Sequence, residues 1–327
     1  MFKIHNYDNN TFDQWLPWGG ITHEHIVRNK DDSLLAILSY APIGQEESAG
    51  IKQQVFPEFI KGWSFWSDRY HTKDGDIYYV AICWNPFFDK KRQIVNTLSD
   101  YCSDIDHYES YFESEIIKIA DNLRVYTSCQ MLNYQEIYNY LAFTISIGTK
   151  NVKMPEIPIY MDVDFSSFVS IGFTANGILI DDKRIVMLSL PSAENEDMEK
   201  FFRLFEDINY RYVQRMLLMS RQDAEADIAS YTKKWCPGRE SIREVITNSV
   251  LGGFNGYYYS SFIFLIDKSE KQEFVKVVSD AAAKLGLVCI AESYNLKDSW
   301  WGCIPGCFTA NINPPVIGFG SALDVLF

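Results

Sequence analysis

The chain has 327 residues with a formal net charge of −13, and 47% of its residues are hydrophobic. That apolar content excludes a disordered chain, and the length predicts about two domains with a large core. The negative charge argues against a primary grip on nucleic acid, whose phosphates need a basic surface, and against broad electrostatic adhesion to an anionic membrane.

The cysteines and the hydropathy of the chain bear on its location. Seven cysteines at irregular spacing indicate reduced thiols in a cytoplasmic protein rather than a disulfide framework. The amino terminus lacks a charged region followed by an apolar core, and no run approaches about 18 apolar residues. We therefore expect neither a secretory signal nor a transmembrane helix.

The first half of the chain predicts two hairpins. Their strands are expected at residues 21–27 with 34–40, around the turn at 29–32, and at 63–70 with 77–84. Each pair consists of aromatic or β-branched residues separated by turn-forming Asn, Asp or Gly.

Helices are expected after the second hairpin. Apolar residues at helical spacing predict a long helix over residues 89–123, with a charged, solvated outer face. A helix over 134–140 and a strand over 141–147 follow. Two hairpins with interleaved helices indicate a ferredoxin-like subdomain over residues 1–150.

The second half, residues 151–327, predicts another α+β subdomain. Its expected strands are 159–164, 168–174, 178–180, 185–190 and 210–219, and its expected helices are 193–208, 220–235 and 240–250. The chain as a whole therefore predicts an α+β protein of two subdomains, with mixed or antiparallel sheets covered by helices.

The clearest pattern in the second half is a strand–helix–strand unit. A strand over 257–266 precedes a helix that Asp267 could cap, and Gly286 stands where a helix ends, before a strand over 287–290. We expect these two strands to be parallel, with a right-handed helical crossover. A short polar helix and a turn at Pro305-Gly306 then follow.

Several motifs, in order along nearly the whole chain, carry a resemblance to a known family. They are Leu16-Pro17-Trp18, the turn Asn29-Lys30-Asp31-Asp32-Ser33, Met154-Pro-Glu-Ile-Pro-Ile-Tyr-Met-Asp162, the stretch 210–219, and Glu292-Ser-Tyr-Asn295 followed by Trp300-Trp301 and Ile304-Pro305-Gly306. Together they resemble the amino-terminal region of the type IV secretion and conjugative-transfer ATPases of the VirB, TrbE and CagE kind.

One residue and one segment depart from that family's pattern. Asp32 replaces a turn glycine, which is acceptable because Asp tolerates left-handed backbone geometry. The segment between Trp235 and Tyr257 is shorter than in many relatives, which puts any role of that insertion in doubt.

A phosphate-binding loop of the form G-x-x-x-x-G-K-[S/T] is absent from the sequence, as is the acidic pair that would follow an apolar strand. No local catalytic motif occurs, so the sequence leaves open whether this chain is an enzyme. The resemblance implies that the motor domain, with its ATP and Mg²⁺, belongs to a carboxyl-terminal half absent from this chain. We therefore expect no cofactor in these 327 residues.

Other candidate sites carry alternatives to this interpretation. His23 and His25 could present two imidazoles on one strand face, with His71 or His107 as a third metal ligand. Surface or packed histidines are the plainer interpretation. Cys303 and Cys307 could meet across a turn as metal ligands, or could be small residues of a buried turn.

Two further alternatives would change the class of protein. Asp162 and Asp164, expected on one strand face, could serve with a histidine as the site of a stand-alone enzyme, although a role at a strand edge or turn is the plainer interpretation. A nucleic-acid contact could use the basic residues of the 211–243 region, which are Arg211, Arg215, Arg221, Lys233, Lys234, Arg239 and Arg243.

An aromatic-rich arm and a pair of tryptophans are the candidates for docking. Trp15, Leu16 and Trp18 form an arm that could anchor a partner or pack on its own domain, and Trp300 and Trp301 could fill the core or form a contact. The resemblance implies docking to inner-membrane subunits of a type IV secretion machine and to sister subunits in an oligomer. It also implies a place on the cytoplasmic side of the bacterial inner membrane.

Overall fold

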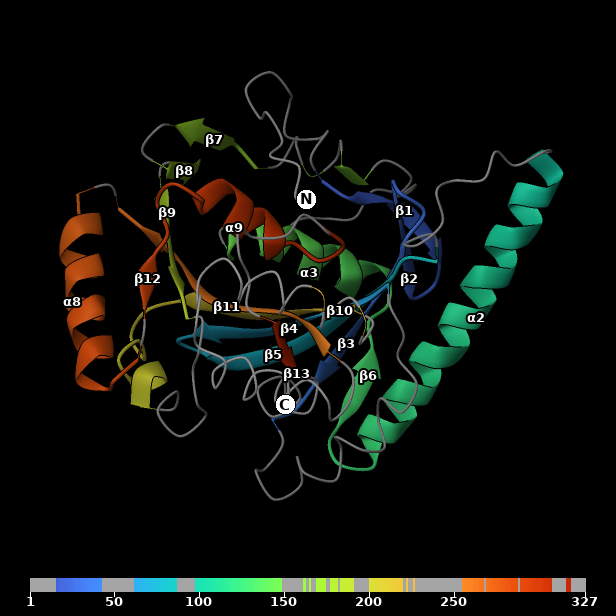
Figure 1. Cartoon of the computed structure of the whole chain (residues 1–327), viewed down its shortest axis with the longest axis horizontal. Helices are drawn as coiled ribbons and strands as arrows, with labels where there is room; N and C mark the ends of the chain where they lie inside the picture. Colours follow the sequence, from blue (N-terminus) through green and yellow to red (C-terminus); the bar gives the residue numbers. More distant parts are fainter. Residues whose placement is uncertain are drawn as a thin grey trace.

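A computed structural model describes most of the chain, and its elements surround one sheet (Figure 1). The described residues are 16–42, 62–86, 98–148, 161–162, 165, 169–174, 177–181, 183–190, 200–219, 222, 226, 255–267, 269–287, 289–307 and 316–318. Trp15, Asp164 and the helices expected at 240–250 and over most of 220–235 therefore lie outside the described residues.

Within the described residues, thirteen strands form a single sheet. They are β1 (Trp18–His23), β2 (Ile26–Asn29), β3 (Leu34–Tyr40), β4 (Trp63–Thr72), β5 (Gly75–Trp84), β6 (Cys129–Met131), β7 (Ile171–Thr174), β8 (Gly177–Ile180), β9 (Lys183–Ser189), β10 (Tyr210–Met219), β11 (Asn255–Ile266), β12 (Ile290–Ala291) and β13 (Val316–Gly318). The order along the sheet is β1-β2-β3-β5-β4-β10-β11-β9-β8-β7. Three short strands lie off this path: β6 pairs with β3, β12 with β9 and β13 with β11.

Strands from both halves of the chain share this sheet. β4 pairs antiparallel with β10, from His71 opposite Tyr210 to Ser64 opposite Leu217. The predicted α+β class is confirmed at this coarse level, as a mostly antiparallel sheet with a few helices. The hydrogen-bonded sheet continues across the boundary at residue 150, and the division into two subdomains and their ferredoxin-like character stay predictions.

The two predicted hairpins are present. β4 and β5 pair over their full ten residues, and β2 pairs with β3 around the turn that contains Asp32. Asp32 has a φ of 64°, which is the left-handed geometry expected where the resemblance calls for glycine. β1 extends the hairpin by pairing with β2.

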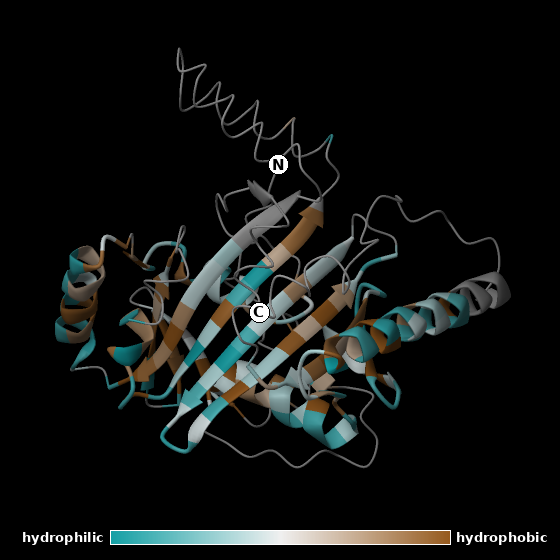
Figure 2. Ribbon diagram, turned by 90° about the horizontal axis from the view of Figure 1, so that it is seen from below, coloured by the Kyte–Doolittle hydropathy of each residue, from teal (hydrophilic) through white to brown (hydrophobic). Residues whose placement is uncertain are grey.

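The four principal helices cover different parts of the sheet (Figures 1 and 2). They are α2 (Leu98–Arg124), α3 (Tyr134–Ser146), α8 (Lys271–Lys284) and α9 (Leu296–Gly302). The long helix predicted over 89–123 corresponds to α2, and residues 89–97 of that prediction lie outside the described residues. No helix among the described residues is long and apolar enough to cross a membrane.

The strand predicted over 141–147 is wrong, because α3 continues through it. Asn133 and Glu136 form a capping box that starts the helix, and Ile137, Leu141 and Ile145 then bury one face at helical spacing. The β-branched residues therefore extend a helix that has already begun. Ile147 ends it with a φ of 49°.

The two strands of the predicted strand–helix–strand unit are parallel, as expected, but they are not neighbours in the sheet. β11 and β12 both pair antiparallel with β9, and Ser261 and Ile290 both face Ser189 from opposite edges. β11 and β12 therefore run parallel with β9 between them. Asp267 is not the helix cap: α8 begins after Glu270, which makes no side-chain cap bond. Gly286, with a φ of 74°, follows the end of α8 as expected.

The two faces of the sheet bury different helices, because successive side chains of a strand point to opposite faces. Trp66 and Tyr70 of β4 face a large apolar cluster with α3 and α9, whereas Phe65 faces a cluster with α2. A third cluster packs α8 and residues 201–205 against β9, β10 and β11. The face covered by α3 and α9 holds the candidate site.

Candidate functional site

Four of the five aromatic-arm and plug candidates lie in one buried cluster. Leu16, Trp18, Trp300 and Trp301 all belong to the core on the α3–α9 face, and each has a relative exposure of 1% or less. Residues nearly 300 positions apart in the sequence thus meet in the interior. Their side chains contact this chain's own core in the described structure, and a role in docking stays a prediction.

The meeting point is the turn that follows α9. The last carbonyl groups of a helix lack intrahelical partners, so other donors must satisfy them. Here Trp66 Nε1 donates to the Gly302 oxygen at 2.9 Å, Arg211 donates to the Cys303 oxygen at 2.7 Å, and Trp18 Nε1 donates to the Pro305 oxygen at 2.8 Å. We call this turn, residues 302–306, with its three donors the α9 junction.

The N-terminal arm and the β2–β3 turn close over the junction. The Lys30 amide donates to the Pro17 oxygen at 2.7 Å, which ties the arm to the turn. Gly306 has a φ of 85°, and a Cβ at that position would lie 2.8 Å from the Asn29 amide nitrogen. The junction therefore requires glycine both for backbone geometry and for space.

An ion pair beneath the junction joins β10, β4 and α3. Arg211 of β10 donates to Asp68 of β4 through Nε at 2.8 Å and through a terminal nitrogen at 3.0 Å, and neither side chain is accessible to solvent. Arg211 also donates to the Thr144 oxygen of α3, and the Tyr140 hydroxyl donates to Asp68.

The electrostatics of this ion pair favour fixed charges. Burial alone would lower the pKa of Arg211, but the adjacent Asp68 carboxylate raises it above its ordinary value. Burial also raises the pKa of Tyr140, so its hydroxyl stays protonated and continues to donate to Asp68. The arrangement holds strands and helices together and presents no reactive group to solvent.

The alternative of a histidine pair on one strand face does not fit the structure. His25 lies in the β1–β2 turn and not on a strand face, and its Nδ1 lies 2.7 Å from the Leu132 oxygen. His23 Nε2 contacts Glu109 of α2 at 2.8 Å. Within the described ranges of the chain, no group of three His, Cys, Asp or Glu side chains is arranged to hold a metal.

The expected strand that would place Asp162 and Asp164 on one face is also corrected. Residues 161 and 162 are helical and do not belong to a strand, so Asp162 cannot share a strand face with Asp164. Asp162 instead forms an ion pair with Lys30 at 2.5 Å, beside the β2–β3 turn. Its partner is therefore a lysine of the turn and not a second carboxylate.

The described residues of the nucleic-acid and cysteine alternatives include Arg211, Arg215 and Cys303, which are all buried. Arg211 and Arg215 are both buried, whereas a phosphate contact needs exposed cations, and the other five basic residues of that alternative lie outside the described residues. Cys303 is a buried thiol whose pKa is raised to about 12 by burial. That burial fits the small-residue interpretation of the turn.

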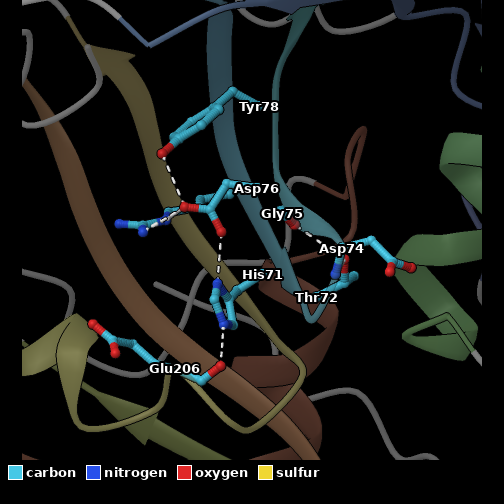
Figure 3. Close-up of polar contacts among 8 residues, drawn as sticks. His71, Thr72, Asp74, Gly75, Asp76, Tyr78 and Glu206 are labelled. Carbon is cyan, nitrogen blue, oxygen red and sulfur yellow. Dashed lines mark hydrogen bonds and ion pairs between the residues drawn. The ribbon is translucent and has the colours of Figure 1, made fainter.

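Sequence reasoning missed a second polar cluster, at the end of the β4–β5 hairpin (Figure 3). Asp76 accepts hydrogen bonds from His71 and Arg69, while His71 also contacts the main-chain oxygen of Glu206. We call these residues the Asp76 cluster. The register of the predicted hairpin could have revealed it, because His71 lies directly opposite Asp76 on the paired strand.

Comparisons with known proteins give distant relatives. No protein-family model matches the chain. It is 20% identical over 262 residues to the conjugal transfer protein TrbE of Rhizobium radiobacter, covering 70% of this chain and 31% of that protein. It is 18% identical over 226 residues to a second portion of the probable conjugal transfer protein TrbE of Sinorhizobium fredii (strain NBRC 101917 / NGR234), covering 60% of this chain and 33% of that one. These similarities support a relation to conjugal transfer.

The chain spans about a third of the length of these curated relatives. Among solved structures, it is similar to the berberine bridge enzyme of Eschscholzia californica with 10% identity and a TM-score of 0.31, over 78% of this chain and 40% of that one. A similarity at that level carries no argument about fold or activity. The relation to conjugal transfer therefore rests on sequence.

Proposed function

We propose that this chain is the amino-terminal assembly and docking region of a conjugal-transfer ATPase of the TrbE kind. The observation that carries the proposal is the similarity to TrbE over 262 residues, which agrees with the ordered motifs of the sequence. In this proposal the chain contacts inner-membrane subunits of the transfer machine and sister subunits. It acts at the cytoplasmic side of the inner membrane.

In the same proposal, ATP and Mg²⁺ bind elsewhere in a longer protein. The lack of a phosphate-binding loop in this sequence supports that division. Titration calorimetry of the purified chain with Mg-ATP tests it, and we expect no binding and no hydrolysis above background. Tight ATP binding by these residues would contradict the division and would favour a stand-alone enzyme.

The α9 junction suits a scaffold. It ties the N-terminal arm and strands β4 and β10 to the turn after α9 through directional hydrogen bonds, and Arg211 also bonds α3. Such a body can present a surface in a defined orientation to a partner. In this proposal Leu16, Trp18, Trp300 and Trp301 shape the scaffold from inside, and Trp15 remains the arm residue to test as a contact.

Co-expression with the inner-membrane subunits of a conjugation system tests docking directly. We expect the chain to sediment with the membrane fraction only when those subunits are present, and Trp15→Ala to reduce that recruitment. Tyr294→Ala is the matched control, because this aromatic side chain is fully exposed in the loop before α9. Recruitment that is absent for a folded chain, or unaffected by removing the partner subunits, would refute the docking role.

A further inference from the structure

The Asp76 cluster is built around one carboxylate with several donors. His71 Nδ1 lies 2.6 Å from Asp76 Oδ1, and Arg69 donates to Oδ2 through Nε at 2.9 Å and through a terminal nitrogen at 2.5 Å. The Tyr78 hydroxyl donates to Oδ2 at 3.3 Å. Donors from both strands of the β4–β5 hairpin thus converge on Asp76 (Figure 3).

His71 also reaches out of the hairpin. Its Nε2 lies 2.9 Å from the main-chain oxygen of Glu206, and its ring stacks on Tyr210 with centroids 4.8 Å apart. A carbonyl oxygen and a carboxylate oxygen can only accept hydrogen bonds. Both ring nitrogens must therefore donate for both contacts to be hydrogen bonds, and only the doubly protonated imidazolium can do so.

The surrounding groups maintain the carboxylate that this arrangement needs. Burial would raise the pKa of Asp76, but the hydrogen bond from His71 and the positive charge of Arg69 outweigh it and lower the pKa below its ordinary value. Burial raises the pKa values of Tyr78 and Tyr210, so both facing phenols are neutral. The carboxylate of Glu206 points away from the ring (Figure 3).

Arg69 reinforces the same connection. Its guanidinium carbon lies 4.0 Å from the centroid of the Phe202 ring, a cation–π contact with the segment at residues 200–208. The segment at residues 200–208 joins the hairpin through His71 and Arg69, and both side chains are oriented by Asp76. A guanidinium group does not change charge between pH 5 and pH 8, whereas an imidazole can.

We propose that His71 is a proton-dependent clamp between the β4–β5 hairpin and the segment at residues 200–208. When the ring loses one proton, the Nε2 proton leaves, because the Nδ1 proton is held by the stronger, charge-assisted bond to Asp76. The hydrogen bond to the Glu206 oxygen is then lost. The segment is left with its apolar packing and the contact of Arg69 with Phe202.

Amide hydrogen exchange tests the clamp on the intact chain. The amides of Leu204, Phe205 and Ile208 are reporters, because each donates to a main-chain oxygen within the segment. From about pH 5 to about pH 8, the interval in which histidine side chains change charge, we expect their exchange, corrected for intrinsic rates, to rise roughly tenfold or more. His71→Gln should show exchange that does not change with pH, because the glutamine amide does not change charge in this interval.

His107→Gln is the matched control, because His107 is exposed on α2 and takes no part in the cluster. It should keep the wild-type profile. A flat wild-type profile, or a rise that persists in His71→Gln, would overturn the proposal. If His71→Gln fails to fold, nitrogen NMR of the wild-type ring decides instead: two protonated nitrogens at about pH 5 support the clamp, and a neutral ring overturns it.

Discussion

Asp68 and Arg211, 143 positions apart in the sequence, form a two-pronged ion pair that no solvent reaches. The pair lies where β4 meets β10, and thus where strands of the first and second halves of the chain join. Its hydrogen bonds extend to α3 and to the turn after α9. One salt bridge therefore holds the sheet and the two helices on one of its faces in a single arrangement.

Removing one member of this pair should be costly. Asp68→Leu leaves the Arg211 guanidinium buried without its counterion, and we expect a loss of about 3–5 kcal/mol in the free energy of unfolding. Urea denaturation measures it. The double variant Asp68→Leu/Arg211→Met should recover part of the loss, because no buried charge remains. Losses that simply add in the double variant would show that the two charges are not coupled.

Substituting Trp18 tests the hydrogen bond that joins the N-terminal arm to the α9 junction. Trp18→Phe removes the donor to the Pro305 oxygen, and a buried acceptor left without a partner costs about 1–3 kcal/mol. The parallel change Trp66→Phe removes the donor to the Gly302 oxygen and should have a similar effect. Both should increase amide exchange at residues 302–307, whereas Tyr294→Ala should not. Unchanged exchange at the turn in both tryptophan variants would argue against the junction.

Gly286 and Gly306 have similar backbone angles, so replacing each with alanine distinguishes the cost of backbone strain from the cost of a steric clash. Gly286→Ala adds a methyl group in open space and should cost about 1 kcal/mol, for the left-handed backbone alone. Gly306→Ala has the same backbone penalty and in addition brings Cβ to 2.8 Å from the Asn29 side chain. Thermal unfolding should therefore show a larger loss for Gly306→Ala, and Asn29→Ala in the same chain should relieve part of it. Equal losses would contradict the close approach.

The Asp76 cluster predicts acid sensitivity. Because the folded-state pKa of Asp76 lies below its ordinary value of 3.8, the carboxylate contributes stability above that value and loses it as the pH falls through the folded pKa. Asp76→Asn should be less stable than the wild type at about pH 5, and the difference should shrink as the pH falls below about 4. Urea denaturation over this range measures it, and a constant difference would contradict the assignment.

Among the described residues, local patterns were sufficient for the hairpins and for the presence of helices α2, α8 and α9. Alternating apolar residues around turn-forming Asp and Gly predict β4 with β5 and β2 with β3, because turn chemistry and strand alternation act over a few residues. Residues 141–147 were wrongly predicted to form a strand because large apolar residues also alternate with smaller ones there. The capping box at Asn133 and Glu136, a few residues upstream, was the better indicator of its conformation.

The sequence by itself determined the α+β class, the turn geometry at Asp32 and Gly286, and the motifs that relate the chain to conjugal transfer, since each depends on neighbouring residues. Only the tertiary structure decided that Trp18, Trp66 and Arg211 satisfy one turn after α9, and that His71 connects Asp76 to Glu206. The physical reason is that buried polar groups need partners wherever the chain can supply them, and strand order, which local patterns do not encode, selects those partners.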